Sequence, residues 1–356
     1  MKHEAKRRRF AAGLLIAAVL LLTAALAGLY IRHHAKLRRE ARLLQQRGWQ
    51  YADTDSGYAL SFLKSGDDAG AHRIVAIADM GVSDYSVQLR LLNASLSDSD
   101  LLVCIDRAGC GLSIDTDTPQ TVQQIVADYR SALKHANIEP PYILLPHAFG
   151  GVYATYWESQ YPDEIEGVFF LDGTCLTAGG AVPSAETGTK MQQILRNFGL
   201  NRLEKHLLPA GFSAAERQSA SLLTLRGTGS SAQCSEMQLA ADNYQTAYES
   251  IVTNTIPKAY VNTASYQTQE DWLAADDWAR TFRQMQELSE AERLQTAAQK
   301  PEECRRYTEQ FVQPYLEQLG NCTCFALPGD TCIYMQKPMQ CAVLFTQFLT
   351  ELEQAE

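Results

Sequence analysis

Two hydrophobic patterns alternate along the chain after its first fifty residues. Short runs of apolar residues, some alternating with polar ones and some unbroken, predict β-strands. Longer stretches in which apolar residues recur at intervals of three or four predict helices packed on a core. The predicted strands are residues 57–63, 73–77, 99–105, 142–145, 167–171, 257–263 and 324–327. The predicted helices are residues 118–136, 151–160, 190–198, 214–223, 235–252, 272–319 and 339–352.

The order of these elements predicts an α/β fold with a mostly parallel central sheet flanked by helices. Parallel central strands are buried on both faces, so they are expected as unbroken apolar runs such as residues 101–105. The strand pattern lapses after Asp172 and returns at residue 257, with helical patterns between. We therefore expect a core formed by residues 49–174 and 256–356, with an inserted helical cap at residues 175–255.

The N-terminal region differs in kind from the rest of the chain. Residues 1–9 are basic and precede an uncharged, mostly apolar run at residues 10–31, which is long enough to span a bilayer as a helix. Ala25-Leu26-Ala27 resembles a signal-peptidase site, so a cleaved secretory peptide is the alternative. Both flanks of the run are basic, so charge alone does not orient it. Residues 32–48 predict a juxtamembrane stalk, expected as a solvated helix without a partner.

Composition narrows the classes of partner. Of 356 residues, 46% are apolar and 20% charged, which suits a folded domain with a substantial core. The net charge is −10, and no basic stripe follows Arg47. Because nucleic-acid binding needs a concentrated basic surface, the sequence predicts no nucleic-acid partner.

Cysteine usage bears on the compartment. There are nine cysteines, and the C-terminal cluster comprises Cys304, Cys322, Cys324, Cys332 and Cys341. Clustered cysteines suit disulfides outside the cytoplasm, although free core thiols are an alternative and a metal site is a third. With the apolar run, this pattern predicts a single-pass cell-membrane protein whose soluble part lies outside the cytoplasm.

One segment is far more specific than the rest. It runs from Tyr142 through Pro146-His147-Ala148-Phe149-Gly150-Gly151, and its small residues allow a strand to turn sharply into a helix. Asp106-Arg107-Ala108-Gly109-Cys110-Gly111 precedes it. Together these segments resemble the nucleophile elbow and an upstream turn of the α/β-hydrolase family. The resemblance extends over residues 74–352 and is nearest to membrane-anchored proteins of Gram-positive bacteria that are classed as hydrolases.

The resemblance also implies that the catalytic triad is degenerate. The family places its serine at Ala148, and a methyl group supplies neither a nucleophile nor a proton. The family's histidine follows the cap, yet the last histidine in the chain is His206. Asp330 or Thr331 stands at the histidine position, depending on the alignment gap.

Two further positions depart from the family pattern. The expected acid position, at residues 262–265, holds no carboxylate, and Glu270 and Asp271 come late in the chain. The oxyanion strand ends in Asp79-Met80, where a carboxylate that pointed inward would repel a developing oxyanion.

Structural rather than catalytic roles are expected for the remaining residues with reactive side chains. His147 is expected to pack beneath the turn rather than act as a substitute base, and Cys332 to pack or form a disulfide rather than act as a nucleophile. Asp79 and Asp330 lack the spacing of a metal site, so neither a metal nor a cofactor is predicted. The predicted pocket comprises Asp79, Met80, His147, Ala148, Phe149, Asp330 and Thr331.

Three functions of different classes fit these features. The leading hypothesis is a pseudohydrolase that binds a small molecule, lipid or peptide, or recruits a protein partner. An active, esterase-like hydrolase with an atypical catalytic set is the second. A purely structural membrane-anchored module is the third.

Overall fold

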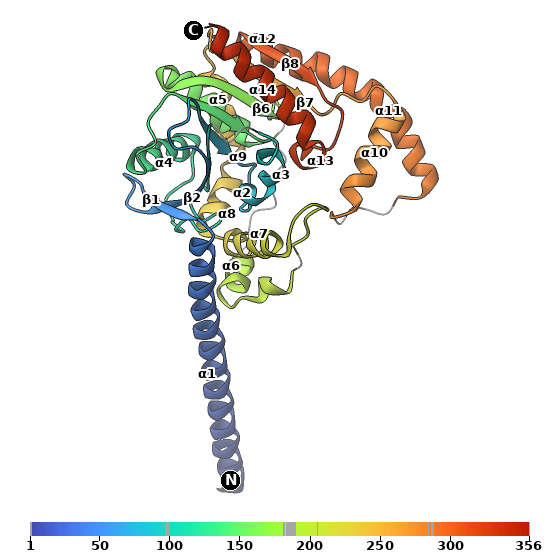
Figure 1. Cartoon of the computed structure of the whole chain (residues 1–356). Helices are drawn as coiled ribbons and strands as arrows, with labels where there is room; N and C mark the ends of the chain where they lie inside the picture. Colours follow the sequence, from blue (N-terminus) through green and yellow to red (C-terminus); the bar gives the residue numbers. More distant parts are fainter. Residues whose placement is uncertain are drawn as a thin grey trace.

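An eight-stranded sheet forms the centre of the molecule. The computed structural model describes residues 2–96, 100–180, 182, 190–204, 206–283, 285 and 288–355. The strand order is β1-β2-β4-β3-β5-β6-β7-β8, and only the pairings β1–β2 and β2–β4 are antiparallel. The predicted parallel α/β fold is confirmed (Figure 1).

The strands are β1 Gln50–Asp53, β2 Ala59–Gly66, β3 Arg73–Ile77, β4 Leu101–Ile105, β5 Tyr142–Pro146, β6 Ile165–Leu171, β7 Lys258–Asn262 and β8 Cys322–Ala326. The helices up to β7 are α1 Lys2–Gln46, α2 Tyr85–Gln88, α3 Arg90–Asn93, α4 Val122–His135, α5 Gly150–Gln160, η1 Pro162–Glu164, α6 Lys190–Asn197, η2 Leu200–Leu203, α7 Ala214–Gly227, α8 Ser231–Gln238 and α9 Ala240–Ser250. Those after β7 are α10 Gln269–Arg280, α11 Glu290–Tyr307, η3 Thr308–Val312, α12 Gln313–Leu319, α13 Ile333–Gln336 and α14 Pro338–Ala355.

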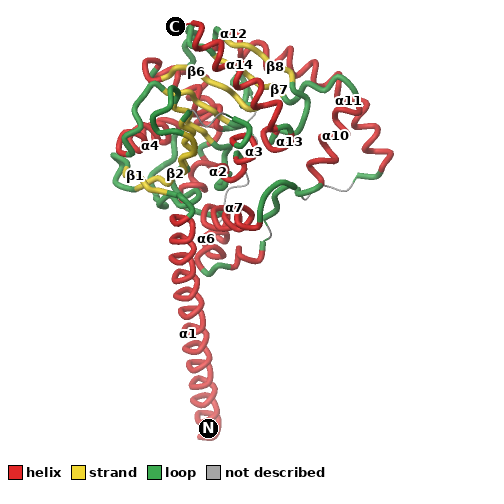
Figure 2. The backbone as a smooth tube through the Cα atoms, in the orientation of Figure 1, coloured by secondary structure: helices red, strands yellow, loops and turns green. Residues whose placement is uncertain are grey.

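The core lies in two layers, one on each face of the sheet. In β3, Val75 and Ile77 join one hydrophobic cluster, whereas Ile74 and Ala76 join the other. Helices cover both faces of the sheet (Figure 2). The unbroken apolar runs of the central strands follow directly, because both faces of each strand need apolar side chains.

Two predicted helices are divided in the structure. The single helical stretch expected at residues 272–319 is wrong: α10 ends at Arg280, and α11 begins only after Ser289. Ser289 caps α11 in a capping box with Glu292, which starts a new helix. The stretch expected at residues 235–252 is likewise two helices, α8 and α9. We call the described residues among 175–255, which contain α6 to α9, the insertion.

Helix α1 extends away from the domain, with the N-terminus at its far end (Figure 1). Among the described residues, it is the one helix long and apolar enough to cross a membrane, and it could anchor the protein there. Its domain-proximal part does not lie free in solvent, so the prediction of a stalk without a partner is wrong. Arg202 of the insertion pairs with Glu40, and Leu44 is fully buried.

Candidate functional site

The turn between β5 and α5 has the geometry that its sequence predicts. Ala148 stands at its tip with a φ of 45°, in the left-handed region that a residue with a β-carbon rarely adopts. A β-carbon on Gly150 would lie 2.5 Å from the carbonyl oxygen of Ile77, so only glycine lets α5 start so close to β3. The strained turn is therefore kept although its central side chain is a methyl group.

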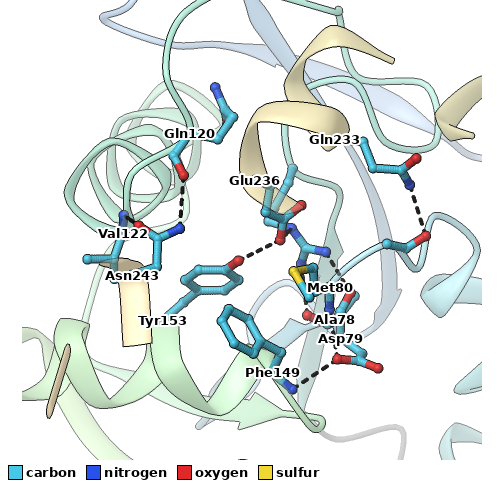
Figure 3. Close-up of polar contacts among 12 residues, drawn as sticks. Ala78, Asp79, Met80, Gln120, Val122, Phe149, Tyr153, Gln233, Glu236 and Asn243 are labelled. Carbon is cyan, nitrogen blue, oxygen red and sulfur yellow. Dashed lines mark hydrogen bonds and ion pairs between the residues drawn. The ribbon is translucent and has the colours of Figure 1, made fainter. Parts of the chain in front are cut away.

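Asp79 occupies the position that faces this turn. One carboxylate oxygen, Oδ1, accepts hydrogen bonds from the backbone N–H of Met80 at 2.8 Å and from that of Phe149 at 3.0 Å (Figure 3). The residue after the elbow position and the loop after β3 are the sources of the two N–H groups that bind an oxyanion in this kind of site. Both donors are thus already bound to a carboxylate of the same chain.

A buried ion pair holds the Asp79 loop in place. Arg107 donates to the carbonyl oxygens of Ala78 and Asp79 at 2.8 and 2.6 Å, and its Nε lies 2.8 Å from Oε1 of Glu236. Tyr153 donates to the same Glu236 oxygen, and both charged side chains are 2% exposed. Glu236 belongs to α8, so the insertion and the loop are fixed to each other through Arg107.

Asp330 and Thr331, the two positions expected for the family's histidine, make different contacts. Asp330 turns away to Arg283, with 2.6 Å between Oδ2 and the guanidinium, and its Oδ1 accepts from the Cys332 N–H. The Thr331 hydroxyl instead lies 3.5 Å from Nε2 of His147. Asp172 directly follows β6 and has a φ of 52°. Burial raises the pKa of Asp172 in spite of the hydrogen bonds from Thr331 and Thr263.

Asp172 is the functional candidate that sequence reasoning missed. The expected acid position after β7 indeed holds Thr263, whose N–H donates to Asp172 at 3.3 Å. The late acids do not take its place, since Glu270 is exposed and Asp271 caps α10 together with Thr268. Its position in the sequence could have revealed it, because Asp172 directly follows a buried parallel strand and so lies at the sheet edge that also carries the elbow.

The two remaining reactive residues are held in unreactive arrangements. His147 is 2% exposed, packs against the rings of Tyr85 and Tyr334, and donates from Nε2 to the Thr331 carbonyl at 3.0 Å. Burial raises the pKa of Cys332 to about 12, which keeps it a thiol at neutral pH.

All nine cysteines are free thiols, and most are buried. This arrangement favours the core-thiol alternative over disulfides. The cysteine pattern therefore gives no support for placing the soluble part outside the cytoplasm.

A cavity of about 840 Å³ lies over the elbow. Three residues of the predicted pocket line it, Asp79, His147 and Thr331. Its described lining does not include the other four, Met80, Ala148, Phe149 and Asp330. Its other walls include Leu203 and Leu207 of the insertion and Phe282, which follows α10. Cavities of this size with mixed walls are the usual sites for small molecules.

His206 brings an unpredicted charged group to the wall of this cavity. Its Nε2 lies 2.9 Å from Oδ2 of the buried Asp84. Burial lowers the pKa of His206, but the hydrogen bond and the charge of Asp84 outweigh that effect, so the pKa lies above its ordinary value. His206 thus ties the insertion to the core beside the site.

Fold comparison identifies the class. Over 85% of this chain, the enol-lactonase of Burkholderia xenovorans is similar, with a TM-score of 0.53, 16% identity and all of its own length covered. A haloalkane dehalogenase, DbeA of Bradyrhizobium elkani, aligns over 87% of this chain and 99% of its own, with a TM-score of 0.51 and 13% identity. The chain has the α/β-hydrolase fold.

Sequence relatives cover only part of the chain. The uncharacterized protein YbdG of Bacillus subtilis is 30% identical over 157 residues, which are 44% of this chain and 46% of that protein. Homoserine O-acetyltransferase of Pasteurella multocida is 38% identical over 61 residues, 17% of each chain. The matched stretches thus span less than half of these relatives. No family model matches the chain.

Proposed function

We propose that this protein is a non-catalytic member of the α/β-hydrolase fold that binds a small amphipathic molecule in the cavity over its elbow. The observation that carries the proposal is the pair of hydrogen bonds from Met80 and Phe149 to Asp79. Two preorganised donors normally stabilise the negative charge that develops in acyl transfer. Here both N–H groups donate to the carboxylate of Asp79, beside Ala148, whose side chain offers no nucleophile.

The walls of the cavity suggest which molecules it accepts. Leu203, Leu207 and Phe282 offer apolar surface. The cationic side chains among its described walls are already paired, Arg283 with Asp330 and His206 with Asp84. Asp79 adds a carboxylate to these walls. The described walls therefore favour a ligand with an apolar body and an uncharged or cationic polar group over an anion.

Activity is tested with the full chain in phospholipid nanodiscs, using p-nitrophenyl esters and acyl thioesters of several chain lengths. We expect no turnover above a denatured control for the natural protein. The double variant Ala148→Ser, Thr331→His is expected to stay silent, because Asp79 still fills the oxyanion donors, although Asp172 is in place to orient a histidine. Adding Asp79→Ala frees both donors, each worth about 10²–10³ in rate, and should give measurable turnover.

Turnover by the natural protein would overturn the proposal and support an atypical active site. His206→Ala would then show whether the His206–Asp84 pair supplies the base. A version with Asp330→His in place of Thr331→His is the matched control, since Asp330 points at Arg283 and a histidine there should give no activity.

Binding is tested separately, by the shift in thermal unfolding with hexanol, hexyltrimethylammonium and hexanoate. A ligand at about 100 times its dissociation constant stabilises the folded state by about 2.7 kcal/mol. We expect a shift with the first two probes and none with hexanoate. Equal shifts with all three, or none, contradict the proposed binding role.

The proposal includes a single-pass location in the cell membrane with the soluble part outside the cytoplasm. Cys324 is exposed and gives a direct test of sidedness. In intact cells, a membrane-impermeant maleimide should label the natural protein and not the Cys324→Ser variant. Labelling only after lysis would place the soluble part inside.

A further inference from the structure

The insertion packs against α1 where its apolar run ends. The rings of Phe198 and Tyr30 lie 6.2 Å apart. A β-carbon on Gly199 would lie 2.2 Å from Nδ1 of His33, so the insertion backbone touches α1 there. Further along both segments, Arg202 forms two hydrogen bonds with Glu40, at 2.7 and 2.8 Å.

These contacts fix the height of the insertion relative to a membrane. The uncharged run ends at Ile31, and a helix rises 1.5 Å per residue, so His33 lies about 3 Å beyond the run. A bilayer that holds residues 10–31 therefore has its headgroup region level with Gly199 and η2. Figure 1 shows α6 and α7 beside this end of α1.

The insertion presents apolar side chains at this height. Leu200, Leu203 and Leu207 are 43%, 83% and 48% exposed. Large apolar residues clustered on a surface mark an interaction site. Exposed Arg32 directly follows the run, and exposed Arg39 lies about 12 Å beyond its end. Both suit the anionic headgroups of a membrane surface.

We propose that Leu200, Leu203 and Leu207 dock into the surface of the bilayer that holds α1. Leu203 and Leu207 also line the cavity over the elbow, so docking opens that cavity to the lipid leaflet. The ligand is then a membrane-resident amphiphile, with an acyl or alkyl chain and an uncharged or cationic head. This identification of the ligand rests on the proposed binding function, whereas the docking itself does not.

The geometry favours lipid over a second protein copy. The apolar side chains are continuous with the membrane-spanning helix through the Phe198–Tyr30 contact, and they are flanked by basic residues. Amphipathic surfaces with an apolar face and basic flanks bind at the membrane interface.

Photo-crosslinking of the full chain in nanodiscs tests the docking. The nanodiscs contain phosphatidylcholine and phosphatidylglycerol, with alkyne-tagged phosphatidylcholine as the probe. The variant Leu203→p-benzoylphenylalanine should form lipid adducts about tenfold more than Met339→p-benzoylphenylalanine. Met339 is 63% exposed and begins α14, which lies at the end of the domain away from α1 (Figure 1).

Equal lipid yields at the two positions would overturn the docking, as would an adduct of Leu203→p-benzoylphenylalanine with a second copy of the chain. Thermal unfolding of both variants checks that each is folded. Binding of the hexyl probes is then measured in detergent micelles. Probe binding without lipid crosslinking would refute the docking and leave the proposed binding function. Crosslinking without probe binding leaves the docking and removes the proposed binding function.

Discussion

Replacing Asp79 gives the sharpest test of how this site is held. Asp79→Ala removes the oxygen that accepts from Met80 and Phe149, and leaves two backbone donors at the cavity floor. A hydrogen bond to a charged group contributes about 1.5–3 kcal/mol, and water entering the cavity restores part of that loss. We expect the free energy of unfolding to fall by about 2–4 kcal/mol. Asp79→Asn keeps an oxygen at the same place, so a loss of about 1 kcal/mol is expected.

The assay is urea unfolding of the full chain in detergent, followed by tryptophan fluorescence, since Trp157 is fully buried in the core. Asp67→Ala is the matched control, because Asp67 accepts one exposed backbone hydrogen bond, from Ala69 at 2.9 Å. Its effect should stay within about 0.5 kcal/mol. If Asp79→Ala is as stable as this control, the carboxylate does not hold the two donors and the reasoning fails.

Three further changes test the surroundings of the site. Gly150→Ala places a β-carbon 2.5 Å from the Ile77 carbonyl oxygen, so thermal unfolding should show a loss of about 3 kcal/mol; an unchanged midpoint would contradict the close approach. Arg202→Ala breaks the pair with Glu40, and amide exchange in α7 should quicken, whereas unchanged exchange would mean that the insertion does not depend on α1. Burial raises the pKa of Asp106 from 3.8 to about 7. Between these pH values the folded state therefore holds a proton that the unfolded state releases. The free energy of unfolding should fall by up to about 1.4 kcal/mol per pH unit as pH rises through this range. Asp106→Asn should flatten that pH dependence, and an unchanged slope would refute it.

The fold was largely predictable because its signals are local. A strand that is buried on both faces is an unbroken apolar run. A helix that is buried on one face has apolar residues at helical spacing. The predictions failed where a short polar signal ended or restarted an element, as at Ser289, which caps α11. The partner of the juxtamembrane helix was also missed, because the sequence pattern of a charged helix is the same whether Glu40 is solvated or paired with Arg202.

Within the site, the sequence alone determined what each position can contribute. Ala148 cannot attack a carbonyl, no histidine follows His206, and the small residues of the elbow predict its turn. These conclusions depend on residue type and on spacing along one segment.

Only the tertiary structure decided where the side chains point and which of them meet. Asp330 and Thr331 are neighbours in sequence, yet Asp330 pairs with Arg283, whereas Thr331 contacts His147. Asp79 turns inward because two backbone donors from different loops converge on it. Such contacts join segments far apart in the chain, so they depend on the packing of the whole sheet, which no local pattern encodes.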